Sequence, residues 1–363
     1  MSAPTRGGPT GPPLHGVRIL DLTRLLPGAY ATLLLADLGA EVIKVEDPRG
    51  GDGMRRLAGG YSIYFELLNR NKRSVTLDLR SADATAVLDA LIEMSDVVVE
   101  SFRPSTAQRL RVDAAALRAR HPRLICASIS GFGASGPYAE RAAHDINYQA
   151  LAGLLASGSK PGPLVADIGS AMQTALGIAA ALFRRERSGE GATIDVSIHE
   201  AALQWSMFPT TQDLEGACYT LYETADVQWL ALGALETKFW AGFCETIERT
   251  DLIPLQFASG SERERVLDDV RRIIKSRTRA EWLERFADAD VCLTTVHTRE
   301  QTVVDPHLAA RGVLTREGGL TYVTQPGMRI HPAPALGADT DEILAAAGLD
   351  ADHRGELRRT GVI

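Results

Sequence analysis

The sequence predicts an α/β protein with a large parallel-sheet domain and a smaller α+β domain, and three observations predict this. The first strand–helix–strand unit occupies residues 16–46, with Gly39 placed to end its helix. Strands and helices then keep alternating to about residue 130. After about Pro209 the texture changes to two strands, a helix and strongly charged helices. The alternation is typical of a doubly wound domain, because parallel strands need a crossover between them.

The elements of the large domain follow in order along the chain. After the strands at 16–22 and 41–46 we expect strands at 73–79, 96–100, 124–130 and 193–198. Helices are expected at 28–40, 81–94, 113–121, 145–155 and 167–186.

Domain boundaries follow from these changes in composition. Residues 1–14 are rich in proline and glycine, which predicts a disordered N-terminus. We assign residues 15–205 to the first part of the large domain, 210–310 to the small domain and 311–363 to a C-terminal return.

Composition excludes some classes of protein. A net charge of −7 argues against a general nucleic-acid binder, and the chain has no apolar run of about 18 residues. We therefore expect no nucleic-acid or membrane partner. The cysteines lack CxxC spacing and stand in apolar contexts, which predicts small buried thiols in a reduced, cytoplasmic protein. They are Cys126, Cys218, Cys244 and Cys292.

Nucleotide-binding motifs are weak in this chain. The first strand–helix junction, "DLTRLLPGAYA", has no GxGxxG. The segment "SGFGASG" at 130–136 resembles a phosphate loop, but it lacks the lysine and runs into Pro137. We interpret it as a tight turn.

A small set of polar residues stands at predicted helix starts. His144 and Asp145 precede one apolar helix, Asp167 begins the next, and Glu236 lies at a strand–helix junction. Helix starts stabilise negative charge, so an enolate or a thioester oxyanion would be held there. Each residue also has an ordinary explanation as a helix cap or a structural side chain. No HxH or HExxH spacing predicts a metal site.

A basic segment provides a candidate anion site. Arg70, Lys72, Arg73 and Arg80 lie in "LLNRNKRSVTLDLR", and Arg103 follows the next strand. We expect them at the strand ends of one sheet, the usual ligand face of such folds, where they would suit a phosphorylated small molecule. A solvated basic loop is the alternative.

The strands, helices and polar motifs described above, taken in their order along the chain, resemble those of the family III CoA-transferases. The resemblance is strongest to the α-methylacyl-CoA racemase branch of that family. The resemblance runs from about Leu14 through "LGALETKFW". It implies a Rossmann-like large domain, an interlocked homodimer, a CoA thioester substrate, and neither a metal nor a redox cofactor.

The resemblance also implies roles for individual residues. His144 and Asp167 would be the two bases, Glu236 would orient His144, and the backbone N–H near Asp145 would face the thioester oxygen. Partial burial is expected to raise the pKa of Asp167. The residues implied to bind CoA and the acyl group are Arg73, Leu77, Asp78, Leu79, Arg80, Arg103, Ala143, Ile146, Asn147 and Tyr148.

The predicted reaction is inversion of the α-carbon of a 2-methyl-branched acyl-CoA. Two alternatives stay open: CoA transfer between carboxylic acids with Asp167 as nucleophile, and a non-catalytic acyl-CoA-binding protein. Departures from the racemase pattern include Asp47 in place of an arginine, Ala143 in place of a glycine, and a short 155–167 loop. Arg49 is a candidate substitute for that arginine.

Overall fold

The structure is a computed structural model that describes residues 11–59, 62–155, 162–208, 214, 216–324 and 328–363. It divides into a first compact unit, residues 1–207 with 312–363, and a second, residues 208–311. Most of the segment predicted to be disordered, residues 1–10, lies outside the described residues. Its described end is held in place, because the backbone N–H of Leu14 donates to the carbonyl of Leu38 at 2.9 Å.

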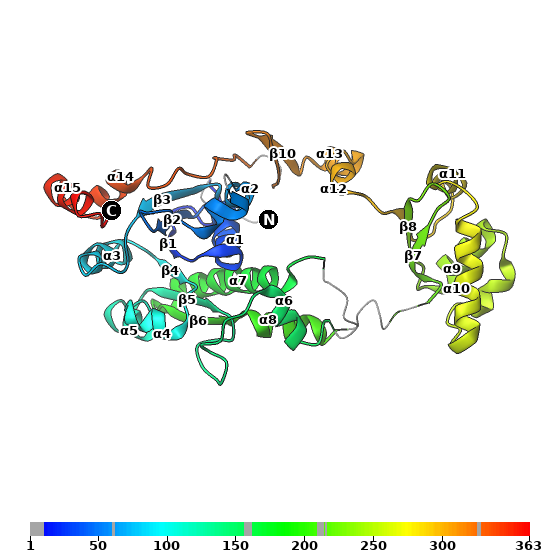
Figure 1. Ribbon diagram of the computed structural model, residues 1–363, viewed down its shortest axis with the longest axis horizontal. Helices are drawn as coiled ribbons and strands as arrows, with labels where there is room; N and C mark the ends of the chain where they lie inside the picture. Colours follow the sequence, from blue (N-terminus) through cyan, green and yellow to red (C-terminus); the bar gives the residue numbers. More distant parts are fainter. Residues whose placement is uncertain (1–10, 60–61, 156–161, 209–213, 215, 325–327) are drawn as a thin grey trace, which may run out of the picture. The chain divides into compact units, whose positions relative to one another are not determined.

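A parallel sheet organises the first unit. Among the described residues its strands run in the order β3-β2-β1-β4-β5-β6 (Figure 1). Leu20 in β1 pairs with Ile43 in β2 and Val98 in β4, so the order reverses beside β1. Ligands of doubly wound sheets bind at the carboxyl edge near such a reversal. The strands are β1 Arg18–Leu22, β2 Glu41–Glu46, β3 Lys72–Thr76, β4 Val97–Glu100, β5 Ile125–Ser130 and β6 Ala192–Ser197.

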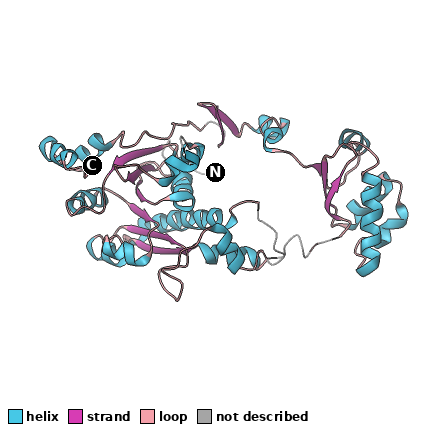
Figure 2. Cartoon of the chain, viewed as in Figure 1, coloured by secondary structure: helices cyan, strands magenta, loops and turns pink. Residues whose placement is uncertain are grey.

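Helices cover both faces of this sheet (Figure 2). On one face Ile19 packs with Leu35 and Ile178, and on the other Leu20 packs with Leu91. The first face carries α1 Leu25–Asp37, α6 Asp145–Leu151, α7 Val165–Ser188 and α8 Ile198–Ser206. The second carries α3 Ala84–Glu93, α4 Pro104–Arg109, α5 Ala114–Arg120, α14 Thr340–Ala346 and α15 Ala351–Arg359. Gly39, at φ +96°, follows α1 as predicted.

Two helix boundaries beside the candidate site residues differ from the prediction. Helix α6 ends at Leu151 rather than at residue 155, and α7 begins at Val165 rather than at Asp167. Asp167 is therefore the third residue of α7 and not its N-cap. By length and composition α7 could cross a membrane, and half of its most apolar 18-residue window is buried in the structure.

A buried charge network lies beneath the carboxyl edge. The Lys44 ammonium is 2.9 Å from Asp52 and donates to the carbonyl of Thr23 at 3.0 Å. Lys72 lies 3.2 Å from Asp21, and both side chains are fully buried. Burial alone would raise the pKa of Asp21, but Lys44 and Lys72 lower it to about 2. The network fixes the turn that follows β1.

The C-terminal segment returns to the first unit beside β3. Asp339 N–H donates to the Ser74 carbonyl at 3.0 Å, and Thr76 N–H donates to the Thr340 hydroxyl at 3.0 Å. A separate antiparallel pair, β10 Leu314–Glu317 and β11 Leu320–Val323, precedes this contact. Two short elements, η1 Gly53–Gly59 and α2 Ile63–Asn69, join β2 to β3.

The second unit is continuous in sequence and has its own core. Trp240, Phe243 and Trp282 are buried there with Tyr222 against a small antiparallel sheet. The strands are β7 Tyr219–Glu223, β8 Trp229–Gly233 and β9 Leu293–Thr295. The helices are α9 Thr237–Thr246, η2 Thr250–Leu255, α10 Gly260–Ile274, α11 Arg279–Arg285, α12 Arg299–Thr302 and α13 Pro306–Arg311.

The cysteines are free thiols. Cys126, Cys218 and Cys244 are buried as predicted. The prediction was wrong for Cys292, which is exposed because it follows the surface turn before β9.

Candidate active site

A cavity of about 760 Å³ opens at the carboxyl edge of the sheet in the first unit. His144 and Asp167, the two predicted bases, both line it. Its apolar wall comes from the start of α1, from η1 and from α2. Further predicted residues that line it are Arg103, Ala143, Asn147 and Tyr148.

His144 is exposed and stands immediately before α6 as its N-cap. Its backbone N–H donates to the side-chain oxygen of Asn147 at 3.0 Å, and its carbonyl accepts the N–H of Asn147 at 2.8 Å. This reciprocal pairing fixes the backbone at His144 while leaving the imidazole at the cavity wall.

Asp145 is the first residue of α6 and is only 4% exposed. One carboxylate oxygen accepts the backbone N–H of Asp167 at 3.0 Å, and the other accepts the side-chain amide of Gln149. The same amide reaches the carbonyl of Pro163 at 3.3 Å. The Asp145 carboxylate therefore links α6 to the first turn of α7.

Asp167 is half-buried, with its side chain at the cavity. Burial raises the pKa of its carboxyl to about 7, and the negative charge of Asp145 acts in the same direction. This agrees with the expected effect of partial burial. At neutral pH the carboxyl is thus divided between its acid and base forms, as a residue that must both take and return a proton requires.

Tyr148 forms part of the cavity wall. Its hydroxyl donates to the carbonyl of Ala143 at 3.2 Å, and its ring meets Phe132 edge-on at 5.3 Å between centroids. Burial, with Asp167 nearby, raises the pKa of the Tyr148 phenol to about 12, so it remains a donor. Gly131 passes so close that a Cβ there would lie 2.5 Å from the Tyr148 oxygen. Glycine at 131 is therefore required by this contact.

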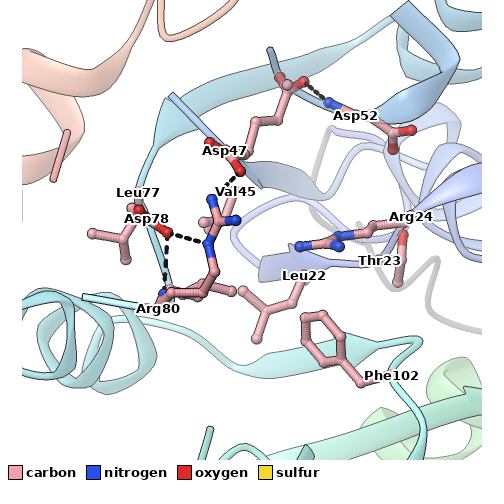
Figure 3. Close-up of a pocket in the computed structure, with 13 residues that line it drawn as sticks. Leu22, Thr23, Arg24, Val45, Asp47, Asp52, Leu77, Asp78, Arg80 and Phe102 are labelled. Carbon is pink, nitrogen blue, oxygen red and sulfur yellow. Dashed lines mark hydrogen bonds and ion pairs between the residues drawn. The ribbon is translucent and has the colours of Figure 1, made fainter. Parts of the chain in front are cut away.

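Arg24 and Phe102 connect this cavity to two neighbouring ones, because both residues line all of them. Figure 3 shows the middle one, with Arg24 and Phe102 facing Arg80. The outer one is a groove of about 600 Å³ whose basic residues include Arg109 and Arg111. The three adjoining cavities make an extended site that suits a long ligand.

Four predicted CoA-binding residues line the middle cavity, namely Leu77, Asp78, Leu79 and Arg80. Arg80 pairs with Asp47 at 2.6 Å and with Asp78 at 2.9 Å, as Figure 3 shows. Arg49 pairs with the same two carboxylates, at 3.2 Å with Asp47 and 2.7 Å with Asp78. Asp47 therefore stands in a ring of alternating charges, and Arg49 is already engaged within it.

Arg73 does not lie at this edge, and this part of the sequence interpretation was wrong. Lys72 and Arg73 begin β3 instead of following it. The Arg73 guanidinium is within 3.2 Å of carboxylates of Glu41, Asp339 and Glu342. Arg70 likewise pairs with Asp37 before the strand, and Lys72 is buried with Asp21.

Two further predicted residues lie elsewhere. Ile146 is on α6, 47% exposed, and is absent from the described lining of the cavity. Glu236 is the exposed N-cap residue of α9 in the second unit. Its predicted action on His144 stays a prediction.

Sequence reasoning missed several arginines of the site. Arg24 follows β1 by two residues and Arg103 follows β4 by three, so the strand-end argument applied to Arg103 also applies to Arg24. Within the described part of the chain, no carboxylate lies within 4.0 Å of Arg24, Arg103 or Arg141. Over those same ranges no cluster of three or more potential metal ligands is found.

Residues 14–340 match the family model described as CoA-transferase family III. The chain belongs to this family. It is 34% identical to the human α-methylacyl-CoA racemase, over 96% of this chain and 97% of the human one. It is also 31% identical to the succinyl-CoA–L-malate CoA-transferase alpha subunit of Chloroflexus aurantiacus, covering 92% and 88% of the two chains.

Solved structures agree with this membership of family III. A CAIB/BAIF family protein from Brucella suis has a TM-score of 0.80 and 26% identity, covering 93% of this chain and all of the other. A hypothetical protein from Mycobacterium tuberculosis has a TM-score of 0.79 and 30% identity over 92% of this chain and 99% of its own. The chain is an enzyme of the family III type, whose relatives include both racemases and CoA-transferases.

Proposed function

We propose that the protein is an acyl-CoA racemase or epimerase, which inverts the α-carbon of a 2-methyl-branched acyl-CoA. The observation that carries the proposal is that His144 and Asp167 line the same cavity, with the pKa of Asp167 raised to about 7. Asp167 can then hold or release a proton near neutral pH.

The chemistry follows from the acidity of a carbon next to a thioester. Neutral His144 removes the α-proton from one face, and the electron pair passes into the thioester to give an enolate. Protonated Asp167 then returns a proton to the opposite face, and the configuration inverts. In the reverse direction the two groups exchange roles. The backbone N–H at Asp145, beside His144, is proposed to hold the enolate oxygen.

The substrate is proposed to lie along the three adjoining cavities. The acyl group and thioester occupy the 760 Å³ cavity, and the phosphorylated end extends past Arg24 and Phe102 toward Arg109 and Arg111. Arginine suits this end because its guanidinium binds phosphate in bidentate fashion. Arg80 contributes less positive charge to this site than its place in the basic segment suggests, because Asp47 and Asp78 form ion pairs with its guanidinium.

A homodimer is part of the proposal. Helices α7 and α8 leave large apolar side chains in contact with solvent, with Leu176 72% and Phe183 68% exposed. A second copy of the chain would cover such a face. The proposal also includes the predicted orientation of His144 by Glu236. Light scattering on the purified protein tests the dimer, and a monomer at all concentrations would contradict it. The free thiols favour the proposed cytoplasmic location.

CoA transfer is the second candidate, and the presence of transferases among the relatives favours it. In that reaction the Asp167 carboxylate attacks the donor thioester and expels CoA thiolate, which leaves a mixed anhydride. The thiolate then attacks the Asp167 carbonyl, so that the donor acid leaves and CoA is bonded to Asp167 as a thioester. The acceptor carboxylate repeats the same two steps in reverse, which forms the new acyl-CoA and restores Asp167. A histidine base has no part in this chemistry. The retention of His144, Asp167 and Glu236 argues against a non-catalytic binding protein.

The deciding experiment incubates one enantiomer of a 2-methylacyl-CoA with the protein in D2O, without an acceptor acid. Deuterium at the α-carbon with loss of optical purity is expected. Asp167→Ala abolishes both racemisation and transfer, whereas His144→Ala abolishes mainly racemisation. Asp113→Asn is the matched control, because it removes a helix-capping carboxylate outside the cavity.

A second assay supplies acyl-CoA donors with free acids and hydroxylamine. New thioesters and a trapped Asp167 adduct, with no α-exchange for any acyl group, would replace the racemase proposal by the transferase one. Full activity in both His144→Ala and Asp167→Ala would overturn the assignment of the site.

A further inference from the structure

The Asp145 carboxylate makes contacts that a helix cap does not. A capping carboxylate accepts an N–H of its own helix, as Asp113 does from Ala116 at 3.0 Å. The Asp145 carboxylate instead accepts the N–H of Asp167, which belongs to the next helix. It is nearly inaccessible to solvent, and no basic side chain lies within 4.0 Å of it in the described residues. Its charge is therefore poorly screened.

We propose that Asp145 is a positioning residue that acts on the reaction through Asp167. Its hydrogen bond fixes the first turn of α7, and its negative charge disfavours a second negative charge on the neighbouring Asp167 carboxyl. The proposal rests on the proposed function only for its catalytic meaning, because the ionisation of Asp167 can be measured without turnover.

Other charged groups face Asp167 from the surrounding elements. His144 comes from the start of α6, while Arg24, Arg103 and Arg141 lie on the loops that line the same cavity. The phenol of Tyr148 borders Asp167 and stays neutral. An arginine in contact with Asp167 would favour its ionised form. The pKa of Asp167 is instead raised, by burial first and by the charge of Asp145 second.

This arrangement explains why two acidic residues are placed together. A carboxylate beside a carboxyl disfavours a second negative charge on the pair. The Asp145 carboxylate accepts hydrogen bonds from two donors, the Asp167 amide and the Gln149 side chain. Asp167 faces the cavity and can exchange its proton there. The pair thus delivers an acid to the position where the predicted mechanism needs one.

The test follows the carboxyl carbons of 13C-labelled aspartates by NMR as the pH is raised. A carboxyl that titrates near pH 7 and disappears in Asp167→Asn identifies the Asp167 signal. In Asp145→Asn the midpoint of that signal is expected to fall by about one pH unit or more. Asp113→Asn, the matched control, leaves it unchanged.

Two further variants separate charge from structure. In Asp145→Asn the new side-chain amide group can face the amide donor of Gln149, which would disturb that contact. Asp145→Ser therefore serves as a second variant that removes the charge. Gln149→Leu removes the other hydrogen bond to Asp145 and keeps its charge, so the Asp167 midpoint is expected to stay near pH 7. Equal shifts in Gln149→Leu and Asp145→Asn would overturn the proposal.

An unchanged midpoint in folded Asp145→Asn would also overturn it, as would the lack of any wild-type carboxyl titrating above pH 6. A failure of the D2O exchange assay leaves these results intact, so the two proposals fail separately. If the protein is a racemase, the pH profile of kcat/KM for Asp145→Asn shifts in the same direction as the NMR midpoint.

Discussion

Asp167→Asn is expected to make the protein more stable at alkaline pH without changing its stability at acid pH. The carboxyl has a pKa of about 7 in the folded chain and an ordinary value of 3.8. A group whose folded pKa is raised stabilises the fold while it is protonated. That contribution is complete below pH 3.8 and is lost as the pH rises to about 7. Asparagine is neutral throughout and avoids the loss.

The magnitude follows from the difference between the two pKa values. It is about three pH units, and each unit corresponds to about 1.4 kcal/mol, so the upper limit is about 4 kcal/mol. Asp167 is only half-buried, and solvent near its carboxyl lowers the effect. We therefore expect Asp167→Asn to raise the free energy of unfolding by roughly 1–3 kcal/mol at pH 8 and by close to zero near pH 4.

Urea denaturation followed by circular dichroism, at several pH values between 4 and 9, measures this difference. The stabilisation should grow between pH 4 and 7 and then level off. A constant difference across the range would show that Asp167 does not change its protonation on folding, and would refute the reasoning. Asp113→Asn, the matched control, keeps a side-chain oxygen that can cap α5, so it is expected to change the free energy of unfolding little.

Three other substitutions test separate features. Lys44→Met leaves the fully buried Asp52 carboxylate without its ion pair, so a loss of about 3–5 kcal/mol in chemical denaturation is expected; a loss below about 1 kcal/mol would contradict the buried network. Gly131→Ala places a Cβ 2.5 Å from the Tyr148 oxygen, so a lower melting temperature and a raised KM for acyl-CoA are expected, and unchanged values would show that Tyr148 moves freely. Burial raises the pKa of the Glu100 carboxyl to about 7. Glu100→Gln is therefore expected to leave the free energy of unfolding unchanged near pH 4 and to raise it by roughly 2–3 kcal/mol at pH 8. Equal free energies of unfolding in the variant and the wild type at both pH values would contradict this pKa.

The sequence predicted the strands of the large sheet well, because each is a short apolar run set off by turn residues. The segment "EVIKVE" was expected as a strand at 41–46, and β2 has these bounds. Some of the short helices were not predicted. Helix α2 has seven residues and α4 has six, and helices of this length depend on packing that no local pattern records.

The site was predicted in part. His144 and Asp167 line one cavity. The sequence had suggested this, because the two residues stand at the starts of successive predicted helices. Arg73 was misplaced because it lies at the amino end of its strand, both in the predicted strand at 73–79 and in β3, whereas ligands bind at the carboxyl end. The Asp145–Asp167 hydrogen bond could not have been predicted, since it depends on how two helices pack and on where α7 begins.

The division of the first unit between two segments has a consequence for synthesis on the ribosome. The second unit, residues 208–311, emerges whole, whereas the first unit still lacks α14 and α15 at that time. Ile343 and Leu357 fill the apolar layer against Leu91 only after the last segment has been translated. A nascent chain halted before residue 340 therefore has this sheet face covered only in part, by α3, α4 and α5, and the exposed apolar remainder makes it a natural client for chaperones.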